Sequence, residues 1–231
     1  GIATSTVSIN SPPVILINGP SSVCAGGSVN LTASGGSSYV WNNSGTSSLI
    51  TISPTVATSY SVIGTDGNGC TGVATSSVSV NSSPLIIING PSSICAGGSV
   101  SLTATGGNGY IWSTANTSAS ITVFPTGPTS YSVISTDVNG CTGIGTANVV
   151  VNSLPLISIN GSSSICAGGS VNLTATGGNN YVWSTASTLS VITITPTSAT
   201  SYSVVGTDAN GCSNTGVFLV TVNSLPLVSF S

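Results

Sequence analysis

The chain has 231 residues, no Lys, Arg, His or Met, and a formal net charge of −3 from its three Asp residues. The lack of cations excludes nucleic-acid binding, because Lys and Arg displace counterions from phosphates, and it excludes attraction to anionic membrane surfaces. It also leaves a Ser nucleophile without a His or Lys to activate it, so we predict that the chain is not an enzyme and uses no cofactor.

The surface of this chain must be unusually poor in charge. Almost no ionisable side chains, combined with positive mean hydropathy, are unfavourable for a soluble monomer. We therefore expect glycans or contacts with other copies of the chain to cover much of the surface. No apolar run reaches the roughly 18 residues that a transmembrane helix requires, so we predict no membrane insertion.

A block of 71 residues occurs three times in strict register. Each copy has two Cys, one Trp, one Tyr and one Asp at the same five positions of the block; in the first copy these are Cys24, Trp41, Tyr60, Asp66 and Cys70. A repeat of this length predicts an array of similar modules. We assign the three modules to residues 11–81, 82–152 and 153–223.

The two ends of the chain fall outside these three modules. Residues 1–10 match the closing strand of a module, and residues 224–231 match the opening strand of another. We expect either that the array continues beyond both ends or that neighbouring subunits complete each other's sheets by strand addition. The reading frame of the gene would show whether the chain is a segment of a longer array or a complete subunit.

Short strands separated by Gly-rich turns follow one another through each module. Residues 29–33 alternate apolar and polar side chains, which predicts a half-buried strand. No helical period is present, and several short strands at this spacing indicate a β-sandwich. In the first module we predict strands, in chain order, at residues 14–17, 29–33, 39–41, 49–52, 60–63 and 78–80, with a turn at 66–69.

In the first two modules the predicted opening strand is apolar on both faces, whereas a half-buried strand needs only one apolar face. Its second face could contact another chain or a neighbouring module. The alternative is a strand that crosses from one sheet to the other. The residues of this candidate assembly strand are Val14, Leu16, Leu85, Ile87, Leu156 and Leu227.

Six cysteines, two per module, indicate disulfides and an extracellular, oxidising setting rather than a zinc site. Sequence alone permits fifteen pairings. Because each module should be self-contained, we predict pairing within modules: Cys24–Cys70, Cys95–Cys141 and Cys166–Cys212. The alternatives are bonds between adjacent modules, for example Cys70 with Cys95, or six free buried thiols.

Two further residue types could form binding sites. The turn that begins at Asp66, like those at Asp137 and Asp208, has the Asp-x-Asn-Gly pattern of a calcium loop. Calcium usually requires several carboxylates, so we predict a plain turn and no metal. The single Trp of each module could be a platform for sugars, but a lone Trp on a central strand is more often the anchor of the core.

Glycosylation is a further possibility for this Asn-, Ser- and Thr-rich chain. Asn30 and Asn172 fall on the outward positions of their predicted strands, as attachment of a glycan requires. The candidate acceptors that match the Asn-x-Ser/Thr pattern are Asn30, Asn42, Asn81, Asn116, Asn160 and Asn172.

Several stretches resemble the immunoglobulin-like (PKD-like) repeats of secreted adhesins and gliding-associated surface proteins of the Bacteroidota type. In the first module they are residues 24–33 (Cys-Ala-Gly-Gly-Ser-Val-Asn-Leu-Thr-Ala), 39–41 (Tyr-Val-Trp), 58–62 (Thr-Ser-Tyr-Ser-Val) and 65–70 (Thr-Asp-Gly-Asn-Gly-Cys). The resemblance implies an all-β fold of three tandem Ig-like β-sandwich domains in an extended array. It also implies seven strands per domain, and a disulfide from the start of the second strand to the loop before the last.

Two functions fit these observations. The first is a structural, non-enzymatic subunit or segment of an extracellular bacterial filament or surface fibre, whose partners are other modules or subunits of its own kind. The second is an adhesin stalk that recognises polysaccharide or another surface. Copying one unit three times favours the structural function, because a binding site seldom needs three equal versions.

Overall fold

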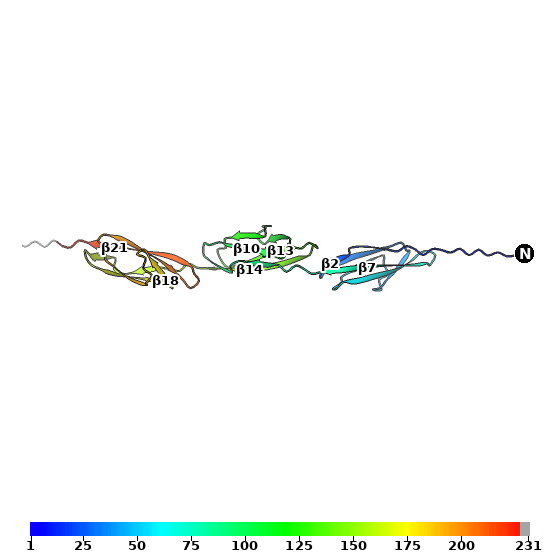
Figure 1. Cartoon of the computed structure of the whole chain (residues 1–231), viewed down its shortest axis with the longest axis horizontal. Coiled ribbons are helices and arrows are strands. Elements are labelled where there is room, and N and C mark those ends of the chain that lie inside the picture. Colours follow the sequence, from blue (N-terminus) through cyan, green and yellow to red (C-terminus); the bar gives the residue numbers. More distant parts are fainter. Residues whose placement is uncertain (227–231) are drawn as a thin grey trace, which may run out of the picture. The chain divides into compact units, whose positions relative to one another are not determined.

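The structure is a computed structural model, and it describes residues 1–226. Within that part of the chain all regular elements are strands, seven per module (Figure 1). No helix there is long and apolar enough to cross a membrane. Residues 1–10 form no strand, and Leu227 of the predicted assembly strand lies outside the described residues.

The strands recur with nearly identical bounds in the three modules. The first module contains β1 (Leu16–Asn18), β2 (Ser22–Cys24), β3 (Val29–Ser34), β4 (Ser38–Trp41), β5 (Leu49–Ile52), β6 (Thr58–Thr65) and β7 (Thr71–Asn81). The second contains β8 (Ile87–Asn89), β9 (Ser93–Cys95), β10 (Val100–Thr105), β11 (Gly109–Trp112), β12 (Ser120–Val123), β13 (Thr129–Thr136) and β14 (Thr142–Asn152). The third contains β15 (Ser158–Asn160), β16 (Ser164–Cys166), β17 (Val171–Thr176), β18 (Asn180–Trp183), β19 (Val191–Ile194), β20 (Thr200–Thr207) and β21 (Ser213–Asn223).

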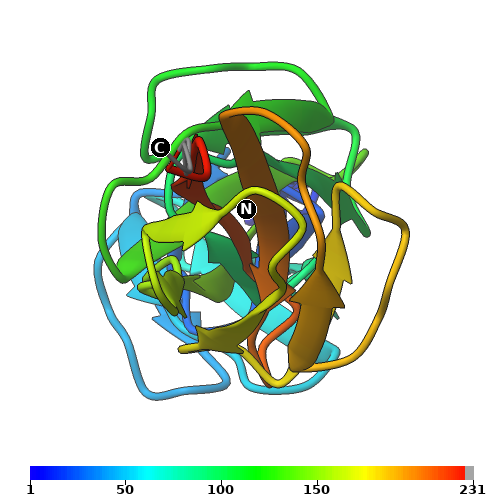
Figure 2. The same cartoon turned by 90° about the vertical axis from the view of Figure 1, so that its left-hand side faces the viewer.

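Each module is an Ig-like sandwich of a three-stranded and a four-stranded sheet. In the first module the sheet orders are β1-β3-β5 and β2-β7-β6-β4. The pairs are antiparallel except β2 with β7, which run parallel. The same orders recur as β12-β10-β8 with β11-β13-β14-β9, and as β15-β17-β19 with β16-β21-β20-β18. The strands of the third module, coloured yellow-green to red, can be followed in Figure 2.

The core of the first module forms where the inward faces of the two sheets meet. Leu31 on β3, Trp41 on β4 and Val62 on β6 are buried there with Val78 on β7. Alternation of buried and exposed residues along β3 and β5 is the period-2 pattern expected of strands covered on one face. The third module has the equivalent cluster, centred on Leu173, Trp183, Val204 and Val220.

The predicted strands are largely confirmed, with three differences. The opening strand, predicted at residues 14–17, is displaced toward the C-terminus and runs from Leu16 to Asn18 as β1. Strand β2 was not predicted, because its three residues carry no alternating pattern of their own. Strands β6 and β7 are longer than expected, and their hairpin pairs Thr58 with Val78 at one end and Thr65 with Thr71 at the other. This hairpin sets the length of the module and holds the turn that contains Cys70 at one end.

Internal contacts divide the chain into two compact units. The first comprises residues 1–88, 104–119 and 132–146, and the second comprises residues 89–103, 120–131 and those from 147 onward. Cys24 and Cys141 belong to the first unit, whereas Cys95 and Cys212 belong to the second. Each unit therefore contains residues from consecutive modules.

Candidate functional site

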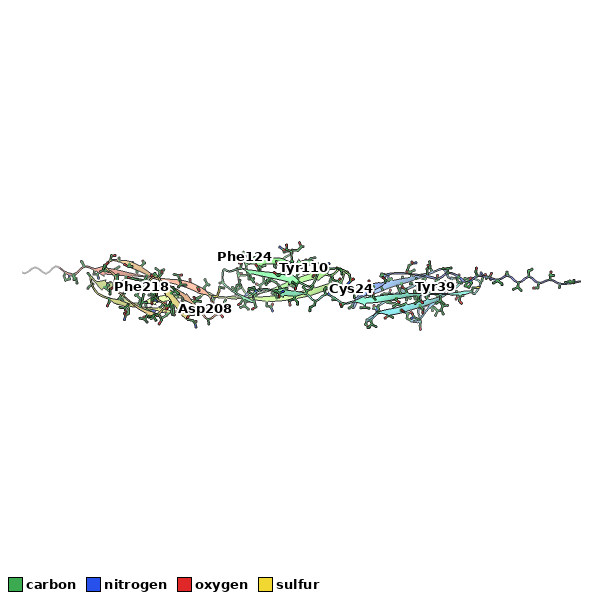
Figure 3. All side chains as sticks on the ribbon, in the orientation of Figure 1. Cys24, Tyr39, Tyr110, Phe124, Asp208 and Phe218 are labelled. Carbon is green, nitrogen blue, oxygen red and sulfur yellow. A yellow bond between two sulfur atoms is a disulfide. The ribbon has the colours of Figure 1, made fainter. Side chains whose placement is uncertain are left out.

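The first cysteine of each module lies at the end of a short strand beside the last residue of the module. Cys24, which is labelled in Figure 3, ends β2 and is level with Asn81 at the end of β7. The Ala25 N–H donates to the Asn81 carbonyl (2.8 Å), and the Gly27 N–H donates to the Cys24 carbonyl (2.9 Å). Gly26 has φ +79°, a conformation that favours Gly. We call this arrangement, residues 24–27 and their equivalents, the strand-end turn.

The strand-end turn is the same in all three modules. Ala96 and Ala167 donate their N–H groups to the carbonyls of Asn152 (2.8 Å) and Asn223 (2.9 Å). The glycines at the positive-φ position have φ +81° at Gly97 and φ +82° at Gly168. The turn therefore depends on local sequence and strand pairing, not on whether its cysteine is bonded.

The second cysteine of each module closes a turn that is held by an Asp carboxylate. Asp66 Oδ1 accepts hydrogen bonds from the N–H groups of Asn68 (2.9 Å) and Cys70 (2.8 Å). The Asp66 N–H donates to the Cys70 carbonyl (2.9 Å), and Gly69 has φ +80°. These contacts confirm the predicted turn. We call residues 66–70 and their equivalents the Asp turn.

The Asp turn is also repeated closely. Asp137 Oδ1 accepts from Asn139 (2.9 Å) and Cys141 (2.8 Å), and Asp208 Oδ1 accepts from Asn210 (2.9 Å) and Cys212 (2.8 Å). These three Asp residues are the only acidic side chains of the chain. Each carboxylate thus fixes the backbone of a cysteine, and in the described residues no three metal-ligating side chains cluster.

Disulfides join strand-end turns to the Asp turns of the following module. The bonds are Cys24–Cys141 and Cys95–Cys212, each with a sequence separation of 117 and a Cα–Cα distance of 5.5 Å. The predicted pairing within modules, Cys24–Cys70, Cys95–Cys141 and Cys166–Cys212, is therefore wrong. The alternative example, Cys70 with Cys95, is wrong as well, although it correctly considered bonds between adjacent modules.

The geometry of one sandwich explains why pairing within a module fails. Cys24 is level with Asn81 at the end of β7, whereas Cys70 directly precedes Thr71 at the start of the same strand. At about 3.3 Å per residue, ten steps along β7 place the two cysteines roughly 30 Å apart. A disulfide requires Cα atoms within about 7 Å, so the two cannot bond without rebuilding the module.

Two cysteines have no partner among the described residues: Cys70 in the first module and Cys166 in the third. Their bonded counterparts are more covered. Cys141 and Cys212 are 0% exposed, whereas Cys70 is half-buried. Likewise Cys166 is exposed, whereas Cys24 and Cys95 are half-buried. Sequence reasoning missed this asymmetry, because it assigned all six cysteines to bonds within modules.

The Trp residues are core anchors, as predicted. Trp41, Trp112 and Trp183 are each 2% exposed. Each indole N–H donates to a backbone carbonyl of the loop that follows, at 2.8–2.9 Å; the acceptors are Ser47, Ser118 and Leu189. Their faces are therefore not available to stack on sugars.

The candidate assembly segment, which enters strand β1, β8 or β15 only at Leu16, Ile87 or Ser158, has one buried and one exposed face. Ile15, Ile86 and Ile157 point into the sandwiches and are buried. The predicted assembly residues are on the other face, and the described ones are exposed: Val14, Leu16, Leu85, Ile87 and Leu156. The backbone of Pro13 and Val14 passes so close to Gly72 and Gly35 that a Cβ would not fit at either glycine.

A second exposed apolar feature crosses the four-stranded sheet of the first module. Val40 is level with Ile63, and Ile63 is level with Val73, so three apolar side chains form a row on the outer face. We call this the outer apolar row. The equivalent exposed residues are Ile111, Ile134 and Ile144 in the second module and Val182 and Val205 in the third.

The predicted glycan acceptors are mostly accessible. Asn30, Asn42, Asn116, Asn160 and Asn172 are exposed, and Asn81 is half-buried. The outward orientation predicted for Asn30 and Asn172 is confirmed, since their amide oxygens accept hydrogen bonds from the Thr51 (2.8 Å) and Thr193 (2.7 Å) hydroxyls on the outer face. Glycosylation itself stays a prediction.

Comparisons with known proteins give structural likenesses at low sequence identity. No family model and no curated protein matches the chain. A structure from a 1.5-MDa bacterial ice-binding adhesin is 18% identical with a TM-score of 0.36, covering 94% of this chain and 100% of that one. A three-domain immunoglobulin fragment of titin is 11% identical with a TM-score of 0.43, covering 94% and 100%. A Ca²⁺-stabilized adhesin of an Antarctic bacterium is 15% identical with a TM-score of 0.40, covering 93% and 75%.

Proposed function

We propose that the chain is a structural, non-enzymatic segment of an extracellular bacterial surface fibre. The observation that carries this proposal is that both disulfides link consecutive modules instead of closing one module. A bond within a module would stabilise a fold. A bond between modules adds a second covalent connection beside the peptide linker, which matters for a part that must resist separation.

The disulfide keeps the first two modules joined even when the peptide linker between them is cleaved. Residues 82–86 join β7 to β8 and form no regular structure. If this linker is cut, the Cys24–Cys141 bond still connects the first module to the second. The complete lack of Lys and Arg removes every cleavage site for trypsin-like proteases. Both properties suit a polymer that is exposed to proteases outside the cell.

Disulfides and surface chemistry support an extracellular place and self-association. Structural disulfides persist in oxidising compartments and are rare in the cytosol. The outer apolar row and the exposed face of the assembly strand offer surface for contacts between copies. We infer a fibre of the PKD-like, Bacteroidota type from the sequence resemblance, with strand addition between copies as one mode of contact.

Electron microscopy of the purified, oxidised chain tests this function. We expect filaments at high protein concentration. Particles that stay uniformly monomeric would overturn self-assembly, while leaving the disulfide pattern untouched. A matched sample with Val40→Ser and Ile63→Ser, which removes two members of the outer apolar row without changing the core, should show fewer lateral contacts.

Polysaccharide recognition by an adhesin stalk is the second candidate. It is favoured by Phe124, which is 73% exposed and is the only exposed aromatic side chain among the described residues. The first module has Ser53 at the equivalent position. A glycan array should show binding that is lost in Phe124→Ser, and an array without binding would weigh against this candidate.

A further inference from the structure

The two disulfides obey one rule. In each, the cysteine of a strand-end turn bonds to the cysteine of the Asp turn in the following module, 117 residues later. Applied to the whole chain, the rule leaves two cysteines without a partner. Each of them, together with its own turn, is called a half-site. Within residues 1–226, no Asp turn lies 117 positions after Cys166, and no strand-end turn lies 117 positions before Cys70. These are the two cysteines without partners in the described residues.

We propose that Cys166 of one copy of these three modules forms a disulfide with Cys70 of the next copy. A second copy that begins three repeats further along the same 71-residue register has its Cys70 117 positions after Cys166 of the first copy, the same separation as in the two existing bonds. The bond would be the third of its kind and would join the copies head to tail. This inference rests on the proposed function, because it specifies how segments of the fibre are linked.

Both half-sites are already built in the single chain. The Asp turn of Cys70 has the hydrogen-bond distances of the bonded Cys141 turn, 2.9 and 2.8 Å to the Asp carboxylate oxygen in each case. The strand-end turn of Cys166 keeps the Gly169 to Cys166 hydrogen bond of 2.9 Å, as the turn of Cys95 does with Gly98. Little rearrangement of the backbone is therefore needed for the bond to form.

Exposure supports the same pairing. The bonded cysteines of the Asp turns, Cys141 and Cys212, are 0% exposed, but Cys70 is not fully covered. Cys166 is exposed, which makes its thiol accessible to an oxidant. In the two existing links the cysteine that corresponds to Cys166 is half-buried and the one that corresponds to Cys70 is buried, so the proposed bond would lower the exposure of both.

The bond forms by thiol–disulfide exchange. The thiolate of one cysteine attacks oxidised glutathione and releases one reduced glutathione, and the second thiolate attacks the mixed disulfide and releases another. Two protein thiols thus become one protein disulfide, and one oxidised glutathione becomes two reduced molecules. The contact is heterologous, so repeating it generates an open polymer unless the geometry closes a ring.

Variants that each retain one of the two thiols test the proposal. Purified chain with both internal disulfides intact is incubated with oxidised glutathione and analysed on a non-reducing gel. We expect a ladder for the wild type, monomer for Cys70→Ser alone and for Cys166→Ser alone, and a single dimer band in their equimolar mixture. Intact masses that account for two internal disulfides would show that both variants fold.

Several results would overturn the proposal. One is dimers in each single variant as abundant as in the mixture, because that indicates indiscriminate oxidation. Another is a wild type that stays monomeric with two alkylatable thiols. In material from the producing cells, a Cys166 bonded to a peptide other than the one that contains Cys70 would contradict the second-copy partner. Filaments that persist in a Cys70→Ser/Cys166→Ser variant would leave the proposed function intact while showing that assembly does not need this bond.

Discussion

Cys24 and Cys70 belong to the same module yet lie at opposite ends of strand β7. Cys24 is level with Asn81, the last residue of β7, and Cys70 immediately precedes Thr71, the first. One cysteine of each module is thus presented at each end of its sandwich. Consecutive modules can therefore be linked by a single type of bond that is repeated along the chain.

The Asp carboxylates should control how readily these bonds form. Asp137→Ala leaves the N–H groups of Asn139 and Cys141 without their acceptor, at a cost of about 1–3 kcal/mol for an unsatisfied group if it stays shielded from water. We expect slower formation of Cys24–Cys141 during refolding in glutathione buffer, measured as alkylatable Cys141 over time.

Two controls accompany that prediction. Asp137→Asn keeps an Oδ1 acceptor and should behave more like the wild type than Asp137→Ala does. Asp208→Ala should slow bonding of Cys212 but not of Cys141. If Asp137→Ala refolds with the wild-type rate of bond formation, the turn does not depend on its carboxylate.

The Trp residues should dominate the stability of their modules. Trp112→Ala removes a side chain that is 2% exposed and leaves the Ser118 carbonyl without its donor. We expect a loss of roughly 3–5 kcal/mol, the usual range for a buried Trp, seen as unfolding at lower urea concentration. Phe124→Ala in the same module should have little effect, because Phe124 is exposed. Equal losses for both variants would contradict the assigned core.

Glycosylation of native material is a separate prediction. The accessible amides of Asn30 and Asn172 make the peptides that contain them the first to examine by mass spectrometry. We expect a mass above that of the bare, disulfide-bonded chain. A native mass equal to that of the bare chain would remove glycans from the account and leave contacts between copies as the means of covering the surface.

Much of this architecture could be predicted from the sequence. The 71-residue register, the alternation along residues 29–33 and the Gly-rich turns indicate repeated sandwiches. The role of Trp41 as core anchor was also predicted, although its strand β4 is an edge strand of the four-stranded sheet and not the expected central one. The Asp66 turn was also predictable, because Asp, Asn and Gly favour such turns locally. These features depend on interactions between residues close in sequence or on the period of side chains along a strand.

The disulfide pairing could not be predicted in this way because it depends on strand direction. Simple alternation of four strands between Cys24 and Cys70 would return the chain to the end where it began. Instead β4 runs in the direction of β2, because β2 is parallel to β7 and β6 is antiparallel to both β7 and β4. Strand β3 reverses the direction of β2, and β5 is antiparallel to β3, so β4 and β5 run in the same direction. The loop of residues 42–48 therefore returns the chain from the end of β4 to the opposite end of the module, where β5 begins. Its sequence has no pattern that predicts this return.

A disulfide map of the Cys70→Ser/Cys166→Ser variant distinguishes the two pairings chemically. Cleavage before each Asp gives peptides 1–65, 66–136, 137–207 and 208–231. We expect two linked pairs under non-reducing conditions, 1–65 with 137–207 and 66–136 with 208–231. A link between 66–136 and 137–207, with the other two peptides unlinked, would indicate the bond Cys95–Cys141 and contradict the structure.

The most direct test of covalent linkage between modules uses the absence of Lys and Arg. Ser82 is exposed in the linker between β7 and β8, so Ser82→Lys creates the only trypsin site of the chain. After alkylation of free thiols and digestion with trypsin, we predict that residues 1–82 and 83–231 stay together until a reductant is added. In a Cys24→Ser/Cys141→Ser background the same cut should release them at once. Separation of the fragments without reductant in the chain that retains Cys24 and Cys141 would contradict the account.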